Sequence, residues 1–169
     1  PISSNIDLAR LEKIGEFRFV FYYVKNTTND DPETFADKKY PYNSVDSASR
    51  KNWLKKFRGV KIYRDEFRVR PYGEDGNDWL GLGERQGRSP GGAGQKMGGY
   101  RIRPNQISGA VYISRIQNIA FEDKSSREGI QENEEFILFK NLLLTIIESF
   151  ETDRNTIMFH LAQLYKKTH

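Results

Sequence analysis

The residues best placed to do chemistry lie in the stretch Asp123-Lys-Ser-Ser-Arg-Glu-Gly-Ile-Gln-Glu-Asn133. Ser125 and Glu128 have the S-x-x-E spacing of a capping box, which predicts a helix with Ser125 as its N-cap. Arg127 would then lie near the positive end of the helix dipole, where a cation costs about 0.3–1 kcal/mol. Gly129 in the first turn costs up to about 1 kcal/mol more. Two unfavourable choices in one turn are typical of a functional site.

An external anion would explain both choices. A phosphate at a helix N-terminus gains hydrogen bonds from free N–H groups, and an arginine beside it adds a charge-assisted fork. Gly129 would let the backbone approach the anion, and Gln131, four residues after Arg127, would project from the same helix face. The alternative is that Arg127 pairs with Asp123 or Glu128 and that Gly129 serves packing alone.

The elements that must position this stretch are strands followed by long helices. Alternating apolar residues predict strands over 17–24, 60–69 and 107–114, the second of them a hairpin that turns at Arg64-Asp65-Glu66. Both faces of the first strand are fairly apolar, which predicts a central place in its sheet. A short helix is expected over 45–57.

The C-terminal third of the chain is predicted to be helical. Ten of the fifteen residues 136–150 are apolar, which predicts a helix buried on more than one side, and 153–166 is a second helical run. We expect one α+β domain over 1–169, a two-layer α/β sandwich with helices on one face of a mixed sheet. The sheet would use 13–70 and 107–123, and the helices 125–166.

Residues 71–106 contain ten glycines and no periodicity, which predicts a long Gly/Arg-rich loop. The loop has no Gly-Lys-Ser/Thr, and neither GLGERQ nor GAGQKM completes G-x-G-x-x-G, so no phosphate loop of either kind is expected. Such a loop is a candidate for ordering when two domains close.

Composition excludes several classes of site. The chain has no cysteine and two histidines, so disulfides, thiol catalysis and cysteine or histidine metal clusters are not expected. No convincing carboxylate dyad appears either, so a free-standing enzyme is not predicted. No run of about 18 apolar residues exists, so we expect no membrane partner and a cytoplasmic location.

Positive charge is concentrated in residues 50–106, which carry 14 basic and 6 acidic groups, a local net charge of +8. A basic block attracts polyanions, so a nucleic-acid-binding module for DNA or RNA is one hypothesis; a solvated cationic face is the simpler one. Tyr72, Trp79 and Tyr100 would supply stacking. The candidate nucleic-acid contacts are Lys61, Arg64, Arg68, Arg70, Arg85, Arg88, Arg101 and Arg103.

Several of these motifs together resemble one family. Residues 126–133 match the Ser-Arg-Glu-x-x-Gln-x-Asn of the middle domain of the ninety-kilodalton heat-shock chaperone. A wider match is to the second domains of uncharacterised bacterial and MORC-like ATP-binding proteins. The segments that are similar to those domains are Gly59–Gly73, Asp78–Leu82, Ile107–Ser114 and Arg127–Gly129. The chain thus resembles the middle or transducer domain of GHKL-type ATPases, the superfamily of gyrase, histidine kinases and MutL, over most of 13–150.

The resemblance implies a fold like domain two of ribosomal protein S five, with a left-handed crossover. It implies that Arg127 reaches the γ-phosphate of ATP, with Ser126 and Gln131 assisting, and that the segment relays nucleotide state to the rest of the protein. The family's N-box helix and D-x-G-x-G are not found in these residues. ATP and Mg²⁺ would therefore bind through an N-terminal ATP-binding domain, the expected partner, in a longer and potentially homodimeric parent.

Overall fold

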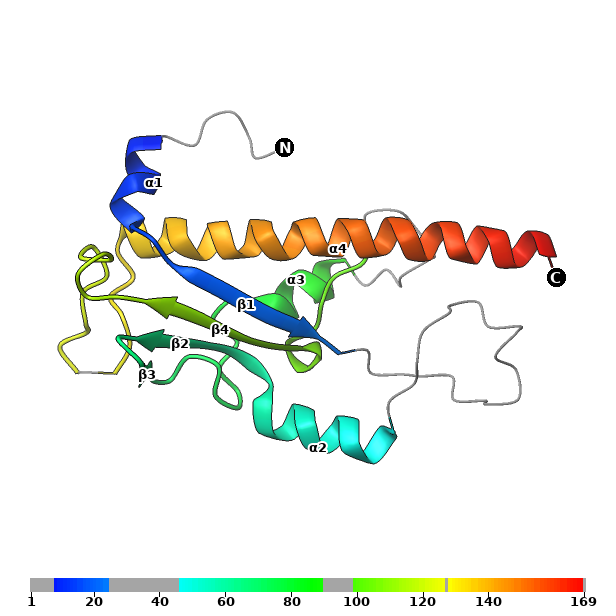
Figure 1. Ribbon diagram of the computed structural model, residues 1–169, viewed down its shortest axis with the longest axis horizontal. Helices are drawn as coiled ribbons and strands as arrows, with labels where there is room; N and C mark the ends of the chain where they lie inside the picture. Colours follow the sequence, from blue (N-terminus) through cyan, green and yellow to red (C-terminus); the bar gives the residue numbers. More distant parts are fainter. Residues whose placement is uncertain (1–7, 25–45, 90–98, 127, 169) are drawn as a thin grey trace.

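The computed structural model describes residues 8–24, 46–89, 99–126 and 128–168. Strands alternate with short helices, and a long C-terminal helix follows them (Figure 1). In chain order the elements are α1 (Leu8–Ile14), β1 (Arg18–Tyr23), α2 (Ser47–Phe57), β2 (Gly59–Arg64), β3 (Phe67–Val69), α3 (Leu82–Arg88), the 3-10 turn η2 (Pro104–Gln106), β4 (Ile107–Ile113) and α4 (Glu134–Thr168).

The four strands form one mixed sheet in the order β1-β4-β2-β3. β4 is antiparallel to β1 and parallel to β2, while β2 and β3 form an antiparallel hairpin. Asp65 and Glu66 have φ angles of 47° and 71°, and two positive φ angles in a two-residue turn match the strand twist. The predicted α+β class and the hairpin are therefore confirmed, but β1 is an edge strand and its predicted central place is wrong.

The core lies between the sheet and α4. Phe21 and Tyr23 of β1 contact Phe150 of α4, with ring centroids 5.5 and 5.7 Å apart. On the helix, a stripe at helical spacing is fully buried and faces the same layer: Phe136, Phe139, Leu143 and Ile147. The molecule is a two-layer α/β sandwich, as expected from the sequence.

α4 is one continuous helix of 35 residues, whereas the sequence suggested two runs. No glycine or proline occurs between residues 134 and 168, so nothing interrupts the backbone hydrogen bonds at the expected break near 151. The helix extends past the end of the sheet towards the C-terminus (Figure 1). In the part of the chain that the structure describes, no helix is both long enough and apolar enough to cross a bilayer.

The predicted loop over 71–106 is largely structured. It contains α3 and η2, and residues 90–98 of the Gly/Arg-rich segment lie outside the described residues. Asp78 caps α3, because its carboxylate accepts hydrogen bonds from the N–H groups of Leu82 (3.0 Å) and Gly83 (2.7 Å). Leu80 and Leu82 are buried in the hydrophobic core, so the Asp-Trp-Leu-Gly-Leu motif contributes core side chains and caps the start of α3.

Candidate functional site

The stretch 123–131 forms a braced loop. Asp123 and Ile130 form an antiparallel bridge. The N–H of Lys124 donates to the carbonyl of Gly129 (3.0 Å), and that of Gln131 donates to the carbonyl of Glu122 (2.8 Å). α4 begins only at Glu134, so the predicted helix start at Ser125 is wrong, and with it the predicted shared helix face of Arg127 and Gln131.

The base of this loop is fixed to the core. Ile130 is fully buried, and its N–H donates to the Tyr72 hydroxyl at 2.9 Å. Gly129 has a φ of +90°, and a Cβ added there would lie 3.2 Å from the Tyr72 oxygen. Gly129 is therefore required by the backbone turn and by the contact with Tyr72, a different reason from the close approach of an anion.

The helix itself begins where helix rules favour it. Asn133 accepts a hydrogen bond from the N–H of Phe136 (2.9 Å) through Oδ1, and its Nδ2 donates to the carbonyl of Ala120 (2.7 Å). Glu134 and Glu135 place acidic side chains in the first turn, where the helix dipole favours them. The unfavourable residues at 127 and 129 thus precede the helix.

The side chains around the tip of the loop face solvent. Ser126 and Glu128 are exposed, and the Ser126 hydroxyl accepts a hydrogen bond from the N–H of Glu128 at 3.4 Å. The Gln131 amide donates to the carbonyl of Asp123 (3.3 Å), so it braces the loop. Arg127 lies outside the described residues.

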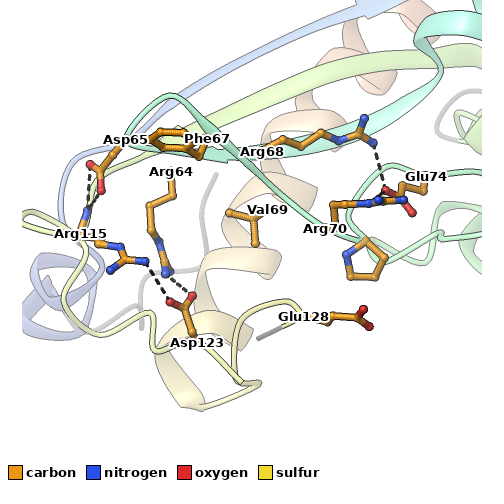
Figure 2. A pocket seen from close by; sticks show the side chains of 11 residues that line it. Arg64, Asp65, Phe67, Arg68, Val69, Arg70, Glu74, Arg115, Asp123 and Glu128 are labelled. Carbon is orange, nitrogen blue, oxygen red and sulfur yellow. Dashed lines mark hydrogen bonds and ion pairs between the residues drawn. The ribbon is translucent and has the colours of Figure 1, made fainter. Parts of the chain in front are cut away.

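Beside the loop is a cavity of about 960 Å³ between the β2–β3 hairpin and residues 115–128 (Figure 2). Hairpin residues line one side, and Asp123 and Glu128 come from the loop. The complete lining is Arg64, Asp65, Phe67, Arg68, Val69, Arg70, Pro71, Glu74, Arg115, Asp123 and Glu128.

Each arginine that lines this cavity has a carboxylate partner. Asp123 pairs with Arg64 and with Arg115, and Arg64 also donates to the carbonyl of Phe121 at 2.6 Å. Asp123 is thus shared by two guanidinium groups.

The second charged group of the cavity centres on Glu74. Arg70 donates to its carboxylate, and this hydrogen bond lowers the pKa of Glu74 below its ordinary value and raises the pKa of Arg70. A guanidinium nitrogen of Arg68 lies 3.9 Å from the same carboxylate. An anion entering the cavity must therefore compete with carboxylates already in place.

The eight predicted nucleic-acid contacts do not form one surface. Lys61 is half-buried on the sheet face that points away from α4. The guanidinium of Arg64 is only 6% exposed. Arg85 and Arg101 are directed at the buried carboxylate of Glu151. The others are distributed between the hairpin and cavity (Arg68, Arg70), α3 (Arg88) and the exposed residue before η2 (Arg103).

The aromatic residues expected to interleave with these cations belong to the core. Tyr72 and Tyr100 are 6% and 8% exposed, and burial raises the pKa of both hydroxyls. Trp79 is half-buried and donates to the carbonyl of Val60 at 2.8 Å. In these positions the three rings stabilise the fold and do not offer a stacking surface.

Sequence reasoning missed the pairing of Arg115 with Asp123, because both lie in the irregular connection between β4 and α4, where a spacing of eight residues predicts no contact. It also missed exposed tyrosines on the second face of the sheet. Tyr22 alternates with the core residues of β1, and Tyr112 does so on β4, which is a signal that could have placed both on one surface.

Within the described ranges there is no group of three or more His, Asp or Glu side chains that could hold a metal ion. Comparison of the chain with protein-family models, with curated proteins and with solved structures finds no match to any of them.

Proposed function

We propose that this chain is the transducer segment of a GHKL-type ATPase. In this proposal the loop 123–131 carries Arg127 to the γ-phosphate of an ATP bound by a separate ATP-binding domain, and the segment passes the nucleotide state to the rest of the protein. The finer S-five-like fold is part of the same proposal.

One observation supports this proposal most directly: the loop that contains Ser126 and Glu128 is held to the core at its base, and these two side chains are exposed. Ile130 and the Asp123–Ile130 bridge hold the base, while Ser126 and Glu128 are open to solvent. A fixed base and an accessible tip suit a residue that must reach a ligand on another domain, because positioning lowers the entropy cost of the contact.

In this proposal the guanidinium of Arg127 stabilises the charge that develops on the transferred phosphoryl group. Its planar fork can donate two parallel hydrogen bonds to phosphate oxygens. Gln131 acts indirectly, because its amide braces the loop through the carbonyl of Asp123. ATP is the substrate, and its Mg²⁺ and the residue that positions water are assigned to the ATP-binding domain.

The test is Arg127→Ala in a parent protein that contains the ATP-binding domain, with ATP turnover and ATP affinity measured separately. Single arginines that act on a transferring phosphoryl group contribute about 10³–10⁵ in rate, so turnover should fall by that order while ATP binding changes little. Arg127→Lys should restore only part of the rate, because an ammonium cannot make the fork.

The matched control is Arg88→Ala. Arg88 is an exposed arginine of α3 that pairs with Glu84 and does not line the cavity. Turnover of this variant should equal that of the wild type. Wild-type turnover in Arg127→Ala, with an unchanged melting temperature, would remove Arg127 from the mechanism and this function from the chain.

A further inference from the structure

The sheet face that points away from α4 carries exposed aromatic side chains. Along β1, Arg18, Val20 and Tyr22 alternate with the residues that pack on α4, and Tyr22 is 62% exposed. On β4, Tyr112 is 39% exposed and alternates with the buried Val111 and Ile113. This second layer of side chains, here called the open face, consists of Arg18, Val20, Tyr22, Lys61, Tyr63, Ser108, Ala110 and Tyr112.

Strand register aligns three of these side chains in one row. Tyr112 pairs with Arg18 of β1 on one side and with Tyr63 of β2 on the other. The Arg18 guanidinium carbon lies 4.5 Å from the centre of the Tyr112 ring, and the rings of Tyr63 and Tyr112 are 5.5 Å apart with 19° between their planes. The Tyr112 ring therefore lies between the Arg18 guanidinium and the Tyr63 ring, and the three groups form one cationic and aromatic stack.

A shallow depression separates this row from Tyr22. Its floor is made of small residues of β4, Ser108, Gly109 and Ala110, and its volume is about 300 Å³. Tyr22 is four residues from Arg18 along β1, which is roughly 13 Å at the usual strand rise. The open face therefore offers two stacking positions with a low floor between them.

All charged side chains that line this depression are basic. Arg18 and Lys61 are among the ten residues that line it, and none of the ten is a carboxylate. The Lys61 ammonium donates to the carbonyls of Phe57 and Arg58, both at 2.9 Å. Burial, with a smaller contribution from Arg68, lowers the pKa of Lys61, and a nearby anion would offset both effects.

We propose that the open face binds single-stranded nucleic acid, with one base stacked on Tyr22, a second base extending the Arg18–Tyr112–Tyr63 stack at its Tyr63 end, and backbone phosphates held by Arg18 and Lys61. Aromatic rings beside cations in an open groove are the features that recognise unpaired strands, since every base offers a face for stacking. A duplex keeps its bases stacked on each other, so it would use only the two cations. This surface shares no residue with the loop 123–131, so the proposal does not depend on the ATPase function.

The test is titration of the 169-residue chain into fluorescein-labelled twelve-nucleotide dT and rU oligomers, followed by anisotropy at about 50 mM salt. Binding to either oligomer and weaker binding to a twelve-base-pair duplex are expected. With two phosphate contacts, the slope of log affinity against log salt concentration should be about −1.4. A preference between dT and rU would identify the natural strand.

Variants locate the site. Tyr63→Ala combined with Tyr112→Ala should lower affinity by roughly 5- to 150-fold for each stacked base that is lost. Tyr63→Phe combined with Tyr112→Phe keeps both rings and should retain binding. The matched control is Phe67→Ala, because Phe67 is 80% exposed but lines the cavity of Figure 2 and lies outside the open face.

The proposal would be overturned by no binding at about 50 mM salt, by equal affinity for duplex and single strand, or by the same loss of affinity in Phe67→Ala as in the double alanine variant. A double alanine variant that binds like the wild type would also overturn it. The double phenylalanine variant keeps the test valid if the alanine variant unfolds, because loss of binding by a folded phenylalanine variant contradicts stacking.

Discussion

Glu151 should be the most sensitive charged residue of the fold. Its side chain is fully buried in the middle of α4. Oε1 accepts the N–H of Ile102 at 2.8 Å, and Oε2 lies 3.0 Å from Nη2 of Arg85. Through these contacts one carboxylate connects α4 to α3 and to the segment that leads into η2.

We expect Glu151→Gln to destabilise the fold by about 3 kcal/mol. Removing one charge of a buried pair costs about 3–5 kcal/mol, because the other charge is left without compensation. The lower end of that range applies, since Arg85 is 18% exposed and keeps a second contact with Glu148. The amide oxygen can still accept the N–H of Ile102, so the loss comes from the charge.

Urea denaturation followed by circular dichroism measures this free energy of unfolding, and a loss of about 3 kcal/mol corresponds to a melting temperature lower by roughly 6–12 °C for a chain of this size. Glu148→Gln is the matched control. The carboxylate of Glu148 is 52% exposed and contacts the same guanidinium, so its removal should cost only about 0.2–1 kcal/mol.

A double-mutant cycle separates the pair from its surroundings. Arg85→Met and Glu151→Gln should each destabilise, and Gln keeps the acceptor for the N–H of Ile102; the double variant should therefore lose less than the sum of the two, with a coupling energy of about 2 kcal/mol. If Glu151→Gln costs no more than Glu148→Gln, or if the coupling is below about 0.5 kcal/mol, the carboxylate does not hold these segments together through its charge.

Two further outcomes follow from the same coordinates. Gly129→Ala should destabilise by about 1–3 kcal/mol in urea denaturation, because φ is +90° and the new methyl group would press on Tyr72; an unchanged midpoint would contradict the turn geometry. The hydrogen bond from Arg58 lowers the pKa of Asp75 below its ordinary 3.8, so Asp75 contributes stability above that pH and loses it as pH falls through the lower, folded-state pKa. Asp75→Asn should therefore melt below the wild type at pH about 7, and this difference should shrink as pH falls below about 4; a difference that grows in acid would reverse the sign.

The sheet and the main helix were predictable because their signals are local. Val60 and Ile62 alternate with polar residues, as do Val111 and Ile113, and the apolar density of 136–150 identifies the helix that covers them. The same alternation led to a wrong prediction for β1, that it would be a central strand. Its second face is apolar enough for a central strand, yet Tyr22 there is exposed at the edge of the sheet.

The helix start could have been placed better with the same rules. Arg127 and Gly129 are poor residues for a first turn, whereas Asn133 followed by two glutamates is a good start, and α4 begins there. The capping-box spacing at Ser125 was a coincidence of short motifs. The pairing of Arg64 with Asp123, and the burial of Tyr72 and Tyr100, depend on contacts between segments distant in sequence, which local patterns do not contain.

The length of α4 gives it a mechanical property. Thirty-five residues at 1.5 Å each make a helix about 50 Å long that starts four residues after Ile130 and extends past the sheet over its last turns. A tilt of about 5° at Glu134 would move the far end by roughly 4 Å, far more than the tilt displaces Glu134 itself. A small change of orientation at the first turn of α4 therefore becomes a displacement of several ångströms at Thr168.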